Sequence, residues 1–226
     1  MLDFPPPCGA ASGPFVPTPV PSVNAMKHLF QSATFAISCA APNQFPPPTG
    51  PEVAFAGRSN AGKSSTLNRL CGQRKLAHVS KTPGRTQMIN FFSLDNGAQL
   101  VDLPGYGFAR APEAERRRWG RLIEAYLRER EALRGLVIVM DIRHPLTDYD
   151  WQMLDWCAGQ GLPVHILLNK ADKLKRGAMQ KALMSVERQL GDEGVDATVQ
   201  VFSAAKGQGL DRLHARLDQW LGFAEG

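Results

Sequence analysis

Short apolar runs alternate with amphipathic stretches along most of the chain. Runs with the length of buried strands lie at residues 34–38, 53–57, 136–141, 163–168 and 198–202. Stretches with the periodicity of helices lie at residues 63–72, 113–133, 148–160, 177–190 and 209–221. This alternation predicts an α/β fold, in which a mostly parallel sheet carries helices on both faces.

One pair of apolar runs breaks the alternation. Residues 89–94 and 99–103 flank the triplet Asp95-Asn96-Gly97. Asn-Gly between two apolar runs is the strongest short-range signal for a β-hairpin. We therefore expect one strand to run antiparallel to the rest of the sheet. A chain of 226 residues suits one such domain with tails better than two domains.

The start of the chain differs from the remainder. Most of the 17 prolines lie before residue 52, and Asp3 is the single charged residue among residues 1–25. This composition predicts a disordered tail over residues 1–25 and one folded domain over residues 26–226. Secretory signals need a basic start with an apolar core, and transit peptides need arginines. Because residues 1–25 have neither, we expect a cytoplasmic protein.

Composition narrows the range of partners. The net charge of +5 suits a polyanion such as RNA, although many proteins without such a partner are equally basic. No two of the four cysteines form a CxxC pair, so neither a zinc site nor a disulfide framework is predicted. No apolar run reaches the roughly 18 residues of a membrane span. We expect neither a membrane nor DNA as a partner.

Candidate chemistry begins at residues 57–64, whose sequence GRSNAGKS fits the pattern G-x-x-x-x-G-K-[ST] between a predicted strand and a predicted helix. Such a loop turns its backbone N–H groups toward a phosphate at a helix N-terminus. We expect Gly57 and Gly62 to leave room for the phosphate. We expect Lys63 between the β- and γ-phosphates and Ser64 on Mg2+. The predicted phosphate-binding residues are Gly57, Arg58, Ser59, Asn60, Ala61, Gly62, Lys63 and Ser64.

A second motif predicts recognition of guanine. Residues 169–172 have the N-K-x-D pattern and follow the apolar run at residues 163–168. The Asp172 carboxylate would accept hydrogen bonds from guanine N1–H and the exocyclic amine, which adenine lacks in that arrangement. Residues 202–206 (FSAAK) would place backbone N–H groups near guanine O6, unless they form a plain strand-to-helix turn. The predicted base-binding residues are Asn169, Lys170, Ala171, Asp172, Phe202, Ser203 and Ala204.

Asn169 and Lys170 are expected to brace the base-binding loop, with the Lys170 stem against the plane of the base.

Two further segments predict a switch that responds to the γ-phosphate. Residues 102–105 (DLPG) form a D-x-x-G motif, in which Asp102 would hold a water of the Mg2+ shell and the Gly105 N–H would meet the γ-phosphate. Residues 80–87 (SKTPGRTQ) must supply a threonine to Mg2+. Thr82 and Thr86 are both available, and we favour Thr86 because it lies nearer the following strand. The two segments, with the adjoining Met88, add Gly84, Arg85, Thr86, Gln87, Met88, Asp102, Leu103, Pro104 and Gly105 to the predicted nucleotide site.

The residues expected to act in hydrolysis are Asn60, Lys63, Thr86 and Gly105. Enzymes of the Ras type place a Gln after D-x-x-G to orient the attacking water. This chain has Tyr106 there, so we expect slow intrinsic hydrolysis. The Asn60 amide oxygen could help to hold K+ beside the phosphates, or it could brace its own loop. Arg85 is a competing source of positive charge.

Two basic clusters leave the RNA contact open. Residues 113–133 carry six arginines, and their neighbouring glutamates suit either a solvated helix face or an RNA contact. Lys170, Lys173, Lys175, Arg176 and Lys181 form a second cluster with little acid nearby, for which RNA and solvent are equally good interpretations. His165 lies in a predicted buried strand and reads as a core histidine.

Together these motifs resemble the EngB family of bacterial GTPases, also called YihA or YsxC. The resemblance rests on GRSNAGKSS at 57–65, SKTPGRTQ at 80–87, VDLPGYG at 101–107, D-x-R at 141–143 and NKAD at 169–172. It implies a Ras-like fold, with Mg2+ contacted by Ser64 and Thr86. It also implies ribosomal RNA of the large subunit as a partner, a role in assembling that subunit, and a link to cell division and septation.

Two other functions remain as alternatives to a ribosomal GTPase. One is a GTPase that acts on the membrane or the division apparatus without binding ribosomes. The other is a metabolic P-loop kinase, which would need an acceptor site and a lid. We expect a monomer that binds GTP and GDP with Mg2+.

Overall fold

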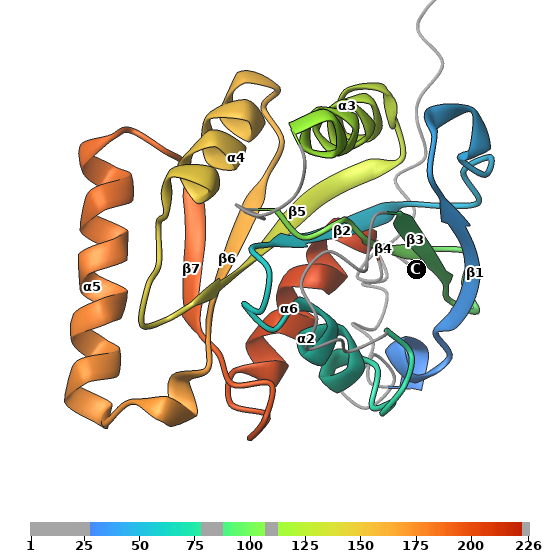
Figure 1. The fold of residues 1–226 in the computed structure, drawn as a ribbon. Coiled ribbons are helices and arrows are strands. Elements are labelled where there is room, and N and C mark those ends of the chain that lie inside the picture. Colours follow the sequence, from blue (N-terminus) through green and yellow to red (C-terminus); the bar gives the residue numbers. More distant parts are fainter. Residues whose placement is uncertain (1–27, 78–87, 107–112, 223–226) are drawn as a thin grey trace, which may run out of the picture.

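The computed structural model describes residues 28–77, 88–106 and 113–222. A sheet of seven strands organises them, in the order β1-β3-β4-β2-β5-β6-β7 (Figure 1). Strand β3 pairs antiparallel with both of its neighbours, and every other neighbouring pair is parallel. The strands are β1 (Thr34–Cys39), β2 (Glu52–Gly57), β3 (Ile89–Ser93), β4 (Gln99–Asp102), β5 (Leu133–Asp141), β6 (Val164–Asn169) and β7 (Ala197–Val201).

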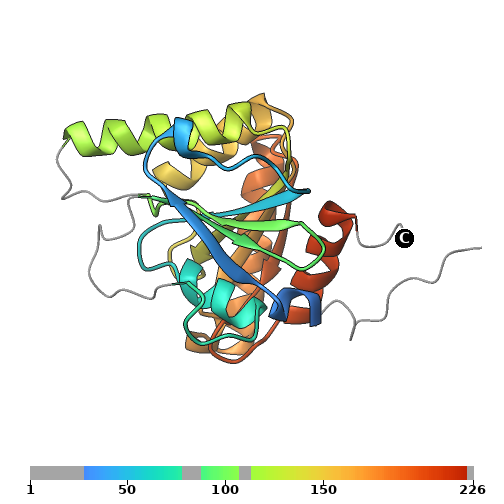
Figure 2. The ribbon, with the colours of Figure 1, turned by 90° about the vertical axis from the view of Figure 1, so that its right-hand side faces the viewer.

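Helices cover both faces of the sheet, as Figures 1 and 2 show. The helices are α2 (Lys63–Leu70), α3 (Glu113–Glu129), α4 (Asp148–Gly159), α5 (Arg176–Asp192) and α6 (Leu210–Leu221), with short 3-10 turns η1 (Pro42–Gln44) and η2 (Ala171–Lys173). Apolar side chains of α3, α4 and α5 share one core cluster, and those of α2 and α6 share the other. The predicted doubly wound α/β fold is confirmed, including its single antiparallel strand.

Strand β5 shows how one apolar run serves two cores. Leu136, Ile138 and Met140 belong to the cluster under α3, α4 and α5. Val137 and Val139 belong to the cluster under α2 and α6. Successive side chains of a strand point to opposite faces, so a strand covered on both sides must be apolar at nearly every position. This is why the central strands read as continuous apolar runs.

The predicted helix over residues 113–133 is wrong at its C-terminal end. Helix α3 ends at Glu129, and β5 begins at Leu133, whose backbone pairs with Glu52 of β2. The buried Glu52 carboxylate accepts hydrogen bonds from Arg130 Nε at 2.9 Å and from the Tyr126 hydroxyl at 2.9 Å. These contacts and the backbone pairing stop the helix, although the apolar pattern of the sequence continues through Leu133.

The predicted tail over residues 1–25 lies outside the described ranges.

Cys39, Cys71 and Cys157 are free and buried. His165 lies in the core, where its ring nitrogens contact Thr198 Oγ1 at 2.7 Å and Gln200 Oε1 at 3.1 Å. Within residues 28–77, 88–106 and 113–222, no helix has the length and hydropathy that crossing a bilayer requires.

Candidate functional site

The loop after β2 makes a tight reversal into α2. Asn60 and Gly62 both have left-handed backbone conformations, with φ of 62° and 101°. The Ala61 N–H donates to the Arg58 carbonyl at 3.0 Å, which closes a turn within the loop. Gly62 is the N-cap of α2. The loop therefore leads into a helix N-terminus, where the first N–H groups have no acceptor within the helix. This arrangement binds phosphate in proteins.

The two glycines of this loop are required for a reason that the sequence reading did not give. A Cβ at Gly57 would lie 2.6 Å from the Val139 carbonyl oxygen of β5, and one at Gly62 would lie 2.2 Å from Asn169 Nδ2. The prediction gave room for a phosphate as the reason. In the structure, close packing of the loop against β5 and against the side chain after β6 already excludes any larger residue.

The loop lysine and the aspartate of the D-x-x-G motif lie together. Lys63 Nζ forms an ion pair with Asp102 Oδ1, and both side chains are buried. Asn90 of β3 reaches the other carboxylate oxygen at 3.5 Å. The parallel pairing of β2 and β4 produces this contact, because it places the carboxyl ends of the two strands side by side.

Ser64 and Asp102 fit a Mg2+ site. A hydroxyl and a carboxylate are the hard oxygen donors that Mg2+ prefers, and in nucleotide sites it is held by few protein groups together with phosphate and water. The described residues contain no group of three or more His, Cys, Asp or Glu that could hold a metal alone. This donor set matches that sparse pattern. The ion would neutralise charge on the phosphates.

The first switch segment lies mostly outside the described residues. Gly84, Arg85, Thr86 and Gln87 fall there, so their predicted roles stay predictions. Met88 is described, with 40% of its surface exposed. Leu103 and Pro104 are buried next to Asp102, and Gly105 is half-buried.

Asn169 braces the base side of the site against the phosphate side. Its Nδ2 donates to the Ala61 carbonyl at 2.9 Å, and its Oδ1 accepts from the Ala204 N–H at 3.1 Å. One buried amide thus joins the phosphate-binding loop to the segment after β7. Replacing it would leave two buried backbone groups without a partner, which costs about 1–3 kcal/mol for each group.

Lys170 is a second brace across the site. It has a left-handed backbone, φ 65°, which turns its side chain back over the loop. Its Nζ donates to the Asn60 carbonyl at 2.5 Å and to Asp141 Oδ2 at 2.9 Å. The Asn60 side chain is exposed and makes no hydrogen bond with any described residue, so the backbone of Asn60 is what holds the loop.

Asp141 was missed as a functional residue by motif reasoning and entered only through the family resemblance. It ends β5 and pairs with Arg143 at 2.6 Å as well as with Lys170. Burial opposes its ionisation, but hydrogen bonds from Arg143 and Lys170 hold the pKa of the carboxyl well below its ordinary value. The sequence does contain a signal for a site residue here, because Asp141 is a charged residue at the carboxyl end of an apolar strand.

The Asp172 side chain is held as an ionised carboxylate that can accept hydrogen bonds. The Ser203 hydroxyl donates to its Oδ1 at 2.6 Å, and Lys173 Nζ lies 3.5 Å from its Oδ2. The hydrogen bond from Ser203, aided by the nearby Lys173, lowers the pKa of the carboxyl below its ordinary value. A carboxylate has about four lone-pair directions, so these contacts orient the group and leave acceptor capacity for a ligand.

The segment after β7 is held by a residue that the sequence reading passed over. Arg69 of α2 donates through Nε to the Ala204 carbonyl at 2.7 Å and through a terminal nitrogen to the Ala205 carbonyl at 2.9 Å. Phe202, Ser203 and Ala204 are buried. No sequence pattern marks Arg69, because its partners are backbone atoms far away in the chain.

Tyr106 links the D-x-x-G segment to two other elements. Its N–H donates to the Gly57 carbonyl at 3.3 Å, and its carbonyl accepts from the Ser59 N–H at 3.1 Å. Its hydroxyl donates to Asp150 Oδ1 of α4 at 2.7 Å. The other Asp150 oxygen accepts from the N–H and the hydroxyl of Thr147, at 2.8 and 2.7 Å.

Burial and the neighbouring Asp150 carboxylate raise the pKa of the Tyr106 phenol well above its ordinary value, so it remains a donor. Its hydroxyl is committed to α4 and does not occupy the role of a water-positioning glutamine. Asp150 was not predicted, since its position three residues after Thr147 reads simply as a helix cap.

The chain is similar in sequence and in fold to known proteins. A family described as "50S ribosome-binding GTPase" matches residues 52–170. The chain is 56% identical over 194 residues to the probable GTP-binding protein EngB of Azoarcus sp. (strain BH72), covering 85% of this chain and 93% of that protein. It is 52% identical over 198 residues to the corresponding Nitrosococcus oceani protein, covering 88% and 99%. The chain belongs to the EngB family of GTP-binding proteins.

Solved structures show the same fold. The chain resembles the crystal structure of a probable EngB GTP-binding protein with a TM-score of 0.61 and 24% identity, over 76% of this chain and 98% of that one. It resembles Aquifex aeolicus Era bound to GDP and AlF4− with a TM-score of 0.61 and 23% identity, over 75% of this chain and 56% of that one. These likenesses show the P-loop GTPase fold, and the EngB membership rests on the sequence relatives.

Proposed function

We propose that this EngB-family chain is a guanine-nucleotide switch, which binds GTP and GDP with Mg2+ and hydrolyses GTP slowly. The observation that carries the proposal is the convergence of four segments at one edge of the sheet. The phosphate-binding loop, the D-x-x-G motif, the N-K-x-D motif and the segment after β7 follow β2, β4, β6 and β7. Hydrogen bonds and the Lys63–Asp102 ion pair join them there. Ligands bind at such carboxyl ends in open α/β sheets.

The arrangement gives each group a task. The loop N–H groups and Lys63 would hold the phosphates, while Ser64 and Thr86 would contact Mg2+ and Asp102 would hold a water of its shell. The Gly105 N–H would sense the γ-phosphate. Asp172 would select guanine, since adenine offers no matching donors. With Tyr106 bound to Asp150, no glutamine is present to orient water at that position, which supports a slow intrinsic rate.

Nucleotide binding tests the switch directly. Fluorescent GTP and GDP analogues should bind in the presence of Mg2+, and excess ATP should fail to displace them. Removing Mg2+ with EDTA should weaken GTP binding more than GDP binding, because the γ-phosphate adds charge that the ion neutralises. Equal displacement by ATP and GTP would remove the guanine assignment. Phosphorylation of an added small acceptor would favour the metabolic kinase instead.

The cellular role proposed here is assembly of the large ribosomal subunit, in the cytoplasm and with ribosomal RNA as partner. Membership of a family described as ribosome-binding GTPases supports it, as does the net charge of +5. A consequent need for the protein in cell division and septation is part of the same proposal. The competing role is a GTPase that acts on the division apparatus without ribosomes.

Sedimentation separates these roles. Cell extract is run through a gradient with GTP or with GDP, and the protein is located by immunoblotting. Co-sedimentation with large-subunit particles that changes with the nucleotide is expected. If the protein stays at the top of the gradient with both nucleotides, the ribosomal role falls while the nucleotide switch survives.

A further inference from the structure

A groove lies away from the nucleotide site, between helix α3 and the chain that leaves β1. It has a volume of about 470 Å³. One wall carries Arg118, Arg121 and Arg128 of α3, and the facing wall is made by residues 40–42 (Ala-Ala-Pro). None of the sequence motifs assigned to the nucleotide includes a residue of this groove.

The arginines of the groove are available to a ligand. Arg118 and Arg121 are exposed and form no ion pair with any residue that the structure describes. Arg128, also largely exposed, lies near Glu124 at 3.7 Å and Glu129 at 3.0 Å. Exposed pairs of this kind are weak and are easily exchanged for a stronger partner. Among the described residues that line the groove, Glu124 is the one acidic residue.

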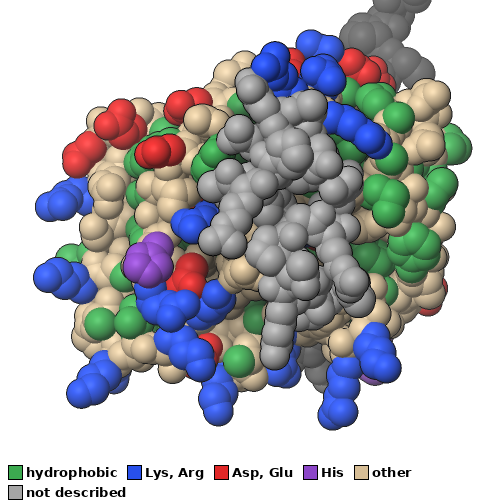
Figure 3. Space-filling model, in the orientation of Figure 1, with side chains coloured by type: hydrophobic (Ala, Val, Ile, Leu, Met, Phe, Trp, Pro, Cys, Tyr) green, Lys and Arg blue, Asp and Glu red, His purple; other side chains and the backbone are tan. Residues whose placement is uncertain are grey.

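Their spacing suits an extended polyanion. Positions 118, 121 and 128 are three and seven residues apart, which places them on one face of α3. With a rise of 1.5 Å per residue they span about 15 Å along the helix, enough to meet several successive phosphates of one nucleic-acid strand. In Figure 3, Lys and Arg side chains gather at the top of the molecule, over α3.

The facing wall is built before any ligand arrives. Gln44 Oε1 accepts hydrogen bonds from the Ala40 and Ala41 N–H groups, at 2.7 and 3.2 Å. The Cys39 thiol contacts the Gln44 carbonyl at 3.1 Å. These contacts fix the shape of the loop, so binding would cost little ordering of this wall.

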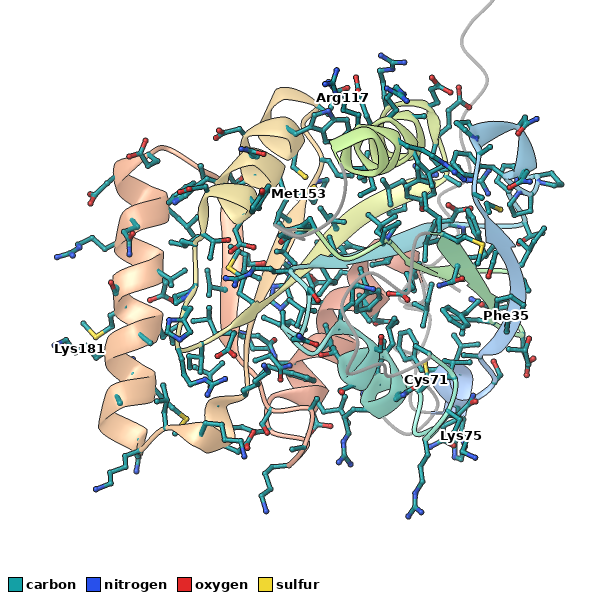
Figure 4. All side chains as sticks on the ribbon, viewed as in Figure 1. Phe35, Cys71, Lys75, Arg117, Met153 and Lys181 are labelled. Carbon is teal, nitrogen blue, oxygen red and sulfur yellow. The ribbon has the colours of Figure 1, made fainter. Side chains whose placement is uncertain are left out.

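The second basic cluster of the sequence is less suitable for a phosphate backbone. Lys170 is engaged by Asn60 and Asp141, and Lys173 lies beside Asp172. Figure 4 shows Lys181 on the outer side of α5 and Arg117 above α3, on separate parts of the surface. Two residues of the second cluster are thus engaged at the nucleotide site, whereas Arg118, Arg121 and Arg128 line one groove together. This difference favours α3.

We propose that the α3 groove binds the sugar–phosphate backbone of RNA, with Arg118, Arg121 and Arg128 on phosphates. The proposal rests on the proposed ribosomal role and names the surface that would carry it. Guanidinium groups fit phosphate oxygens in a bidentate manner. An acidic protein segment is less suitable, because protein interfaces need large apolar or aromatic side chains at their centre, and the opposite wall offers two alanines and a proline.

The test compares two variants of equal charge. The groove variant is Arg118→Gln with Arg121→Gln, and the control is Lys181→Gln with Arg188→Gln on α5, where both side chains are also exposed. Binding is measured to purified large-subunit ribosomal RNA and to large-subunit particles over a series of salt concentrations. GTP affinity and melting temperature should be unchanged in both variants, because neither touches the nucleotide site.

We expect the groove variant to bind RNA about tenfold or more weakly. The slope of log affinity against log salt concentration should become shallower by about two, because two phosphate contacts are lost. The control should change the affinity by less than about twofold. Equal RNA binding by the groove variant and the wild type, or an equal loss in the control, overturns the proposal while the ribosomal role survives. A loss on particles without a loss on naked RNA would assign the groove to a protein. Failure of the wild type to bind either target would remove the ribosomal role itself.

Discussion

The two halves of the nucleotide site are built differently. On the base side, protein atoms already engage the side chains of Asn169, Lys170 and Asp172. On the phosphate side, Lys63 is paired with Asp102, and both would gain new neighbours in a complex with nucleotide and Mg2+. Selection of guanine can therefore rest on side chains that are already held in place. The response to the γ-phosphate must instead rest on contacts, such as the Lys63–Asp102 pair, that change when nucleotide binds.

The largest effect is expected from Asp172→Asn, which alters the base side of the site. The amide presents a donor where guanine needs an acceptor, so the preference for GTP over xanthosine triphosphate should fall by about 10³-fold or more. Competition binding with the two nucleotides measures it. Asp196→Asn, at an exposed position, is the matched control. An unchanged preference would show that Asp172 does not read the base.

A large effect on stability is expected from Lys63→Met, which alters the phosphate side of the site. It leaves the buried Asp102 carboxylate without its cation, a loss of about 3–5 kcal/mol in the free energy of unfolding. Chemical denaturation without nucleotide measures it. Asp102→Asn added to Lys63→Met should recover most of the loss, since the uncompensated charge is then gone. No recovery would mean that the pair contributes little in solution.

The third prediction concerns the rate of GTP hydrolysis on the phosphate side, which K+ is expected to raise. We expect GTP turnover in KCl to exceed that in NaCl at equal ionic strength, and Asn60→Ala to abolish the difference. The Asn60 side chain is exposed and is not held by any described residue, so its oxygen is available to a cation. One electrostatic contact to developing charge is worth about 10²-fold in rate. Identical rates in the two salts would direct attention to Arg85.

A smaller effect is expected from Tyr106→Phe, which removes the hydroxyl bound to Asp150. The buried carboxylate loses one of its donors, at a cost of about 1–2 kcal/mol in the free energy of unfolding. The residue after Gly105 then loses its attachment to α4, so the ratio of GTP to GDP affinity should also change. Tyr149→Phe, on an exposed tyrosine, is the control. A stable variant with an unchanged affinity ratio would reduce Tyr106 to a packing residue.

The smallest effect is expected from removing residues 1–25. They precede every motif and carry one charge, so a protein that starts at Met26 should keep its melting temperature and its GTP affinity. Both are measured beside the full chain. A clear loss of either would mean that the N-terminal residues dock on the domain.

The sequence alone determined the fold class and the identity of most candidate site residues. Periodicity predicts strands and helices because burial on one or two faces dictates where apolar residues fall. Motifs such as GRSNAGKS and NKAD are local, since a loop and the strand end beside it carry both the geometry and the functional groups. The position of the antiparallel strand was equally local, because Asn96-Gly97 fixes a hairpin.

Tertiary structure decided what depends on residues far apart in the chain. The end of α3 is set by Glu52, 78 residues before Arg130. Arg69, Asp141 and Asp150 contact partners far away in the chain, and no local pattern identifies those partners. The same is true of the groove, where two alanines and a proline become a wall only because β1 ends beside α3. Side-chain contacts across the sheet depend on strand order and packing, which local sequence patterns do not encode.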